Sequence, residues 1–214
     1  GDFTLSQIIA SSDSSYNTAV GFNSLGLLNK GSTNTAMGYN SISSANNSDF
    51  NIGIGFAAVR SKPNLNSSAG NSNIGIGKKA MYDISGGSFN VAIGEESMYD
   101  LRDGGSHNVA LGYKSLYGDE FNGIDNIAIG NQPLLSCTTG DLNVALGSES
   151  LRTNTTGDSN ISIGTKTLHD NEIGGNNIAI GTEALYSNID TSYNIAVGWN
   201  ALHDNIKSYN IAIG

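Results

Sequence analysis

The sequence predicts an all-β protein, a parallel β-solenoid (β-roll) of about twelve 17-residue coils. The first observation is a five-residue word, Asn-apolar-small-apolar-Gly, which occurs twelve times at steps of 16 to 18 residues, with one step of 22. The second is the alternation inside the word, because apolar residues two apart are typical of a short β-strand. A 17-residue unit is also too short for two helices and a turn. Each word therefore predicts one strand per coil, paired in parallel with the next strand about 4.8 Å away.

The start of the chain and the third coil depart from the regular spacing. Residues 1–16 lack the complete word, and we expect them to form a degenerate first coil or N-terminal cap. The repeat domain is expected over residues 17–214, with Gly214 lying inside a repeat. The stretch 60–72 carries five extra residues compared with the other coils and predicts the longest loop.

Two residues of the word have expected structural roles. The asparagine directly before the strand is expected to form a ladder of amide hydrogen bonds from coil to coil and to cap the turn. The glycine after the strand occurs in all twelve copies and indicates a corner with positive φ or a close backbone approach. An apolar residue, most often leucine, follows four positions after the glycine in eleven copies and is expected to fill the core. The repeat asparagines are Asn17, Asn34, Asn51, Asn73, Asn90, Asn108, Asn126, Asn143, Asn160, Asn177, Asn194 and Asn210.

The middle residue of the strand is small in every copy. Because strand residues alternate between faces, we place its large apolar neighbours in the coil's own core and the middle residue on the outside. An outer column restricted to Ala, Gly and Ser indicates close contact with other chains, and we expect a homotrimer around a common axis, with a dimer as the alternative. The residues of this expected oligomer seam are Ala19, Ala36, Gly53, Gly75, Ala92, Ala110, Ala128, Ala145, Ser162, Ala179, Ala196 and Ala212.

Composition and charge exclude several classes of function. The net charge is −9 and the ten Lys and Arg residues are scattered, so nucleic acid is not an expected partner. No apolar run reaches the roughly 20 residues of a membrane span, so membrane insertion is not expected. No metal-ligand spacing appears, and the stretch Gly75-Ile76-Gly77-Lys78 lacks the Ser or Thr of a phosphate-binding loop. We therefore expect neither a metal nor a cofactor.

The turn after the core leucine is the candidate ligand-binding surface, because neighbouring coils differ most there. In several coils this turn begins with a tyrosine or histidine followed by a polar residue. Stacked at one position, these side chains would form a stripe of rings and carboxylates that suits sugars, or a carboxylate column for Ca²⁺. Solvated edge residues whose rings cover the core are the alternative. The candidate residues are Tyr82, Asp83, Tyr99, Asp100, Tyr117, His169, Asp170, Tyr186, His203 and Asp204.

A second column of rings directly precedes the repeat asparagine. We expect these rings to close the core at the corner of the coil, with ligand stacking as the alternative. They are Tyr16, Phe50, Phe89, His107, Tyr193 and Tyr209.

Little in the sequence indicates catalysis, and we do not expect an enzyme. The three histidines lie in separate coils, and no Gly-x-Ser-x-Gly elbow is present. Stacking of coils would still allow the acid pair of a polysaccharide-degrading tailspike. Asp83 with Asp100, and Asp170 with Asp204, are the pairs to test.

Words such as Asn90-Val91-Ala92-Ile93-Gly94 and Asn143-Val144-Ala145-Leu146-Gly147 resemble the head repeats of YadA-like trimeric autotransporter adhesins. The longer unit, as in residues 151–160, looks more like the repeats in tail-fibre proteins of phages and large viruses. The resemblance implies a left-handed parallel β-roll, three of which pack about one axis with the small residue towards it. The 17-residue unit is longer than that of the adhesin heads, so a larger outer turn is expected.

The expected function is a non-enzymatic structural and attachment module, located extracellularly on a virion surface. A trimeric fibre or head segment would contact a host cell-surface glycan or protein through its outer loops. A bacterial adhesin head on the outer surface of the cell and a glycan-cleaving tailspike are the alternatives. Ice or crystal binding is weaker, because it requires a regular array of exposed threonines that the chain lacks.

Overall fold

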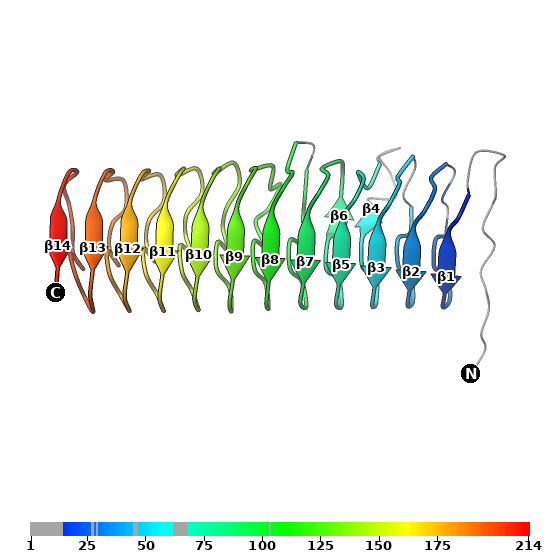
Figure 1. Ribbon diagram of the computed structural model, residues 1–214, viewed down its shortest axis with the longest axis horizontal. Coiled ribbons are helices and arrows are strands. Elements are labelled where there is room, and N and C mark those ends of the chain that lie inside the picture. Colours follow the sequence, from blue (N-terminus) through cyan, green and yellow to red (C-terminus); the bar gives the residue numbers. More distant parts are fainter. Residues whose placement is uncertain (1–14, 27, 29, 45–46, 62–67, 103) are drawn as a thin grey trace.

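The computed structural model describes residues 15–26, 28, 30–44, 47–61, 68–102 and 104–214. Across these residues the chain is all-β and contains no helix, and twelve strands joined by eleven turns form a single parallel sheet (Figure 1). The predicted parallel β-solenoid is confirmed. Most of the expected N-terminal cap, residues 1–14, lies outside the described residues. The strands of the long sheet are β1 (Thr18–Val20), β2 (Thr35–Met37), β3 (Ile52–Ile54), β5 (Ile74–Ile76), β7 (Val91–Ile93), β8 (Val109–Leu111), β9 (Ile127–Ile129), β10 (Val144–Leu146), β11 (Ile161–Ile163), β12 (Ile178–Ile180), β13 (Ile195–Val197) and β14 (Ile211–Ile213).

Neighbouring strands of the long sheet pair in one constant register. The middle residue of each strand stands beside the middle residue of the next, as in Ala128 beside Ala145 and Ala145 beside Ser162. A second, two-stranded parallel sheet joins β4 (Arg60–Ser61) to β6 (Tyr82–Ile84) on the third and fourth coils. The constant register means that each coil position forms a straight column along the rod.

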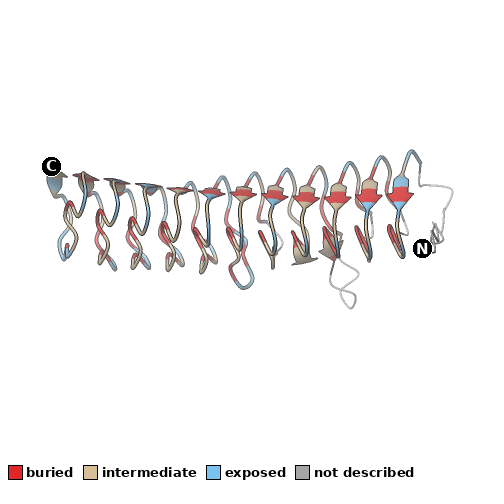
Figure 2. Cartoon of the chain, turned by 90° about the horizontal axis from the view of Figure 1, so that it is seen from below, coloured by how far each residue is buried: buried red, intermediate tan, exposed pale blue. Residues whose placement is uncertain are grey.

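The middle residue of the strand points into the coil, so the predicted orientation is wrong. Figure 2 shows a buried residue at the centre of the strands, between residues that are less buried. The physical reason is the narrow interior, which has room for a large side chain from one wall only. A Cβ built on Gly53 would lie 2.6 Å from Cγ1 of Ile42, the core residue of the preceding coil. The expected seam column is therefore core: Ala19, Ala36, Gly53, Gly75, Ala92, Ala110, Ala128, Ala145, Ser162, Ala179 and Ala196 are buried, and Ala212 is half-buried.

The large apolar residues that flank the middle residue face outward instead. In β9, for example, Ile127 and Ile129 are each 38% exposed, whereas Ala128 between them is fully buried. The same arrangement recurs on every strand of the long sheet, with a Thr only at the first flanking position of β1 and β2. We call this surface, formed by the first and third residues of the twelve strands, the apolar face.

The glycine that ends each word is required by a close approach between coils. Gly147 has φ +139°, and a Cβ placed on it would lie 2.3 Å from the carbonyl oxygen of Gly164 in the next coil. Both the backbone conformation and the missing side chain are therefore necessary, and the predicted corner glycine is confirmed.

The turn after the glycine uses left-handed residues that are not glycine. Glu149 and the core residue Leu151 have φ of 56° and 50°, and the equivalent residues of the other coils have the same sign. Their N–H groups donate in opposite directions, from Glu149 to the carbonyl of Asn131 (2.9 Å) and from Leu151 to the carbonyl of Thr167 (3.0 Å). Each turn is thereby hydrogen-bonded to both neighbouring coils, which stabilises a conformation that costs free energy by itself.

The predicted asparagine ladder is confirmed. The buried Asn143 donates its backbone N–H (2.9 Å) and its Nδ2 (3.1 Å) to Oδ1 of Asn126, and its Nδ2 also donates to the carbonyl of Gly157 (2.8 Å). Asn160 then donates in the same way to Asn143. One side chain thus links two coils and also closes the loop of its own coil.

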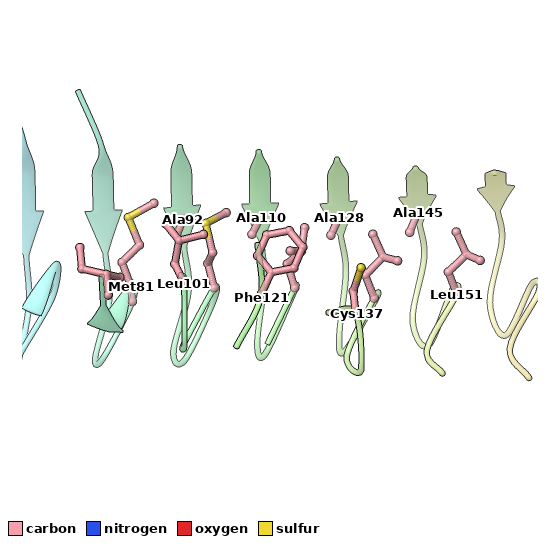
Figure 3. Close-up of a cluster of buried hydrophobic side chains, with 14 of the residues drawn as sticks. Met81, Ala92, Leu101, Ala110, Phe121, Ala128, Cys137, Ala145 and Leu151 are labelled. Atoms are coloured by element: carbon pink, nitrogen blue, oxygen red, sulfur yellow. The ribbon is translucent and has the colours of Figure 1, made fainter. Parts of the chain in front are cut away.

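A second ladder, which the sequence analysis did not predict, runs through the C-terminal coils. Asn171 donates its Nδ2 to Oδ1 of Asn154 (2.7 Å), Asn188 to Asn171 (2.9 Å) and Asn205 to Asn188 (3.1 Å). These asparagines stand three residues after the core leucine, a position that holds the buried apolar residues Leu28, Ile84, Leu101 and Cys137 in four earlier coils. Figure 3 shows that interior, with Leu101, Phe121 and Cys137 among the buried side chains.

Candidate functional site

The predicted tyrosines and histidines stack directly after the core leucine position. The ring centroids of Tyr82, Tyr99 and Tyr117 are 5.0 Å apart at each step. His169, Tyr186 and His203 form a second stack, with steps of 4.9 and 5.1 Å. We call these two sets the tyrosine stack and the histidine stack. The structure thus brings together the rings of the candidate ligand site, while ligand binding itself stays a prediction.

Stacking changes what the rings can offer to a ligand. Inside each stack a ring face is covered by its neighbour, so the middle ring presents its edge and its hydroxyl group. Tyr99 is half-buried, and its burial, with smaller effects from neighbouring Asp83 and Tyr82, raises the pKa of its phenol to about 12. A sugar ring can therefore lie against a tyrosine face only at the end of a stack.

Basic side chains accompany the tyrosine stack. The Arg60 guanidinium lies 4.7 Å from the ring centroid of Tyr82, and the Lys114 ammonium lies 5.0 Å from that of Tyr117. Both distances are within the range of cation–π attraction. The Lys79 ammonium also lies 5.1 Å from the ring centroid of Tyr82. None of these cations was predicted from the sequence, although Lys79 and Lys114 stand at one repeat position, two residues after the corner glycine.

The predicted carboxylates of the tyrosine stack are in contact with cations. Arg60 Nη1 lies 3.9 Å from Asp83 Oδ1, and Arg102 Nη2 lies 3.0 Å from Asp100 Oδ2. Arg102 also contacts Glu120 at 3.2 Å. In this part of the predicted carboxylate stripe, both predicted aspartates therefore lie beside an arginine.

The carboxylates of the histidine stack orient the histidines. Nδ1 of His169 lies 2.6 Å from Oδ1 of Asp170, and Nδ1 of His203 lies 2.7 Å from Oδ1 of Asp204. One coil separates the two pairs, and it places Ser187 at the position of the aspartates. Among the residues that the structure describes, no cluster of three His, Cys, Asp or Glu side chains is arranged to hold a metal ion.

A groove of about 450 Å³ lies between the two stacks. At this point the column of rings is interrupted by Leu135 and Arg152, which follow the core leucine in two successive coils. Tyr117 ends the tyrosine stack at one side of the groove. Lys114, Tyr117, Asp119, Gln132, Leu135 and Arg152 contribute to its lining.

Sequence reasoning missed a further stack directly after the corner glycine. The centroids of Phe22, Tyr39 and Phe56 are 5.5 and 5.3 Å apart, and all three rings are exposed. Trp199, 73% exposed, stands at the same repeat position near the other end of the rod. The regular spacing of these aromatics in the sequence was the signal that could have revealed the column.

The rings before the repeat asparagine do not close the core. Phe50 is 59% exposed, and Phe89 stacks on His107 at 5.2 Å on the outer surface. The residues at this position have φ near 60°, a left-handed conformation that turns their side chains away from the interior. The expectation of core closure is therefore wrong.

No protein-family model matches the chain, and neither a curated protein nor a solved structure matches it. Within the described ranges, no helix is long and apolar enough to cross a membrane. A functional proposal must therefore come from the geometry of the coil itself.

Proposed function

We propose that the chain is a non-enzymatic structural and attachment module, a trimeric fibre or head segment on the surface of a virion. Its outer turns contact a host cell-surface glycan or protein. The observation that carries the proposal is the apolar face, which extends over all twelve strands of the long sheet. The resemblance to adhesin heads and tail-fibre repeats supplies the extracellular setting, the three-fold assembly and a left-handed winding of the coil.

The apolar face supports association with copies of the same chain. Exposed contiguous apolar surfaces of this extent mark protein–protein interfaces. Because the face repeats with the spacing of the coils, a second copy lying parallel to the first meets an apolar residue at every coil. Copies related by rotation about an axis along the rod bury the face and form a closed oligomer. The seam consists of the flanking residues of the strands, such as Ile127 and Ile129.

The opposite side of the coil supports attachment. Figure 2 shows the long sheet along one side of the rod and the remaining turns on the other. Those turns carry both ring stacks and differ in sequence from coil to coil. A trimer that buries the sheet leaves three such surfaces accessible, which suits multivalent binding to a host surface.

The assembly is tested by charge substitution on the apolar face. Ile127→Lys combined with Ile161→Lys places charges in the seam without touching the coil's core, and we expect light scattering to show loss of the trimer while circular dichroism retains the β signal. Thr165→Lys, exposed and outside the apolar face, is the matched control and should remain trimeric. A wild-type monomer at micromolar concentration, or a double variant that stays trimeric, contradicts the proposal.

Attachment is tested with a glycan array and with host cell envelopes, using the assembled oligomer. We expect binding above background without release of new reducing ends. Release of reducing ends would favour the tailspike alternative. An oligomer that binds neither glycans nor envelopes would restrict the role of the chain to that of a spacer.

A further inference from the structure

The groove between the two ring stacks has the composition of a ligand site. Tyr117 is the last ring of the tyrosine stack, and the next coil offers Leu135 instead of a ring at the equivalent position. The end of the stack therefore faces a recess rather than another aromatic side chain. In this recess a sugar ring can approach the last ring of the tyrosine stack.

Two cations line this recess on a chain whose net charge is −9. The Lys114 ammonium lies 3.5 Å from Glu96, so its charge is partly balanced. The Arg152 guanidinium makes no ion pair or hydrogen bond with any part of the chain that the structure describes. Asp119, the acid in the lining, is exposed at the rim. Arg152 is therefore a planar, unpaired donor suited to a carboxylate.

Neutral polar groups complete the lining. Among the described residues, the side chains of Gln132 and Ser136 make no internal hydrogen bond, and both contribute to the groove. Thr138 donates its hydroxyl proton to the carbonyl of Thr155 (3.1 Å) and keeps its oxygen as an acceptor. A groove with one aromatic wall, a few neutral donors and acceptors and one unpaired cation matches an acidic sugar residue.

We infer that this groove binds the acidic residue of a carboxylated saccharide, with the carboxylate on Arg152 and the sugar ring at the Tyr117 end of the tyrosine stack. The inference rests on the proposed attachment function and names the chemical class of its ligand. It also limits the site to the interval between the stacks, because the middle ring of each stack offers only its edge and its hydroxyl group.

The test compares trigalacturonic acid with its methyl ester, two probes that differ in charge but not in the sugar ring. Binding to the assembled protein is followed by titration calorimetry and saturation-transfer NMR at about 0.15 M salt, where long-range charge effects are screened. We expect the acid to bind and the ester to bind at least about tenfold more weakly, as for loss of a charge-assisted hydrogen bond.

Two variants locate the site. Arg152→Gln should weaken binding of the acid about tenfold or more and leave the affinity for the ester unchanged. Tyr117→Leu introduces the residue that the next coil already carries at this position, and it should weaken both probes by about fivefold. Lys166→Gln removes one positive charge in another coil and is the matched control, expected to bind the acid as the wild type does.

The inference is overturned if neither probe binds at millimolar concentration, if acid and ester bind equally, or if Arg152→Gln and Lys166→Gln weaken binding equally. These failures are separable from failure of the proposed function. Glycan-array or envelope binding that survives Arg152→Gln would retain attachment and reject this groove. Binding of trigalacturonic acid without envelope binding would retain the groove and reject host attachment.

Discussion

Two strands of the long sheet have glycine, Gly53 and Gly75, as their middle residue. Glycine is required there by the β-branched core residues that face it. A Cβ on Gly75 would lie 2.5 Å from Cγ2 of Val59, a core residue whose stiff side chain cannot rotate away easily. Gly75→Ala should therefore lower the free energy of unfolding by about 1–3 kcal/mol through overpacking, partly offset by about 0.5–1 kcal/mol from the reduced entropy of the unfolded chain. The midpoints of the two ranges give a net loss of roughly 1 kcal/mol.

The pair is tested by a double-mutant cycle in urea at fixed protein concentration. Val59→Leu combined with Gly75→Ala recreates the Leu–Ala pair that other coils use, as in Leu116 facing Ala128. We expect Val59→Leu to restore at least the free energy of unfolding that Gly75→Ala removes. The coupling free energy between the two substitutions should be about 1–2 kcal/mol. The reasoning is refuted if Gly75→Ala alone is neutral, or if Val59→Leu does not rescue it. The pair Ile42 and Gly53 provides an independent replicate.

Three further predictions concern single residues. Asn143→Ala removes the acceptor of Asn160 and the side-chain donor to Asn126 and Gly157. It should lower the free energy of unfolding, measured in urea, by about 2–4 kcal/mol. A loss smaller than that of an Asn→Ala change at an exposed position would contradict the role of the ladder. Gly147→Ala should melt at a much lower temperature than Gly104→Ala, because both have positive φ but only Gly147 meets a carbonyl oxygen at 2.3 Å; equal melting temperatures would rule out the close approach as the cause. Burial raises the pKa of the Cys137 thiol from 9.0 to about 12, so the folded state binds the proton more tightly than the unfolded state. The free energy of unfolding of the wild type, relative to that of Cys137→Ala, should therefore be constant below pH 9 and fall as the pH rises from about 9 towards 12. A difference between the two proteins that does not change with pH would contradict this prediction.

The sequence predicted the solenoid because the word recurs at one coil length, and periodicity depends little on which way a strand faces. It did not predict which face of the strand is inside. Alternation shows only that Ala128 points to the face opposite Ile127 and Ile129. Choosing the more hydrophobic face as the buried one then predicts that the isoleucines are inside. This choice fails here because the outer face of the strand is apolar as well. The pairing of β-branched core residues with glycine, in Ile42 with Gly53, was the available signal that the small column meets the core.

The candidate site was predicted in part. The repeat spacing placed the tyrosines and histidines at one position, and the structure stacks them. The groove could not be predicted, because it arises where two coils lack a ring and the cations beside it come from different repeat positions. The second ladder was visible as asparagines three residues after the core leucine, but its significance depends on burial, as for Asn171 at 0% exposure.

The asparagine ladder has a polarity along the rod, and this polarity implies an order in which the coils fold. Each repeat asparagine up to Asn194 presents a side-chain oxygen that accepts the backbone N–H of the next repeat asparagine, and in most coils, as at Oδ1 of Asn143, its Nδ2 group as well. During synthesis the earlier coil exists first, so it can act as the template onto which the next 17 residues fold. We therefore expect the rod to grow one coil at a time from its N-terminal side, with each completed coil setting the register of the next.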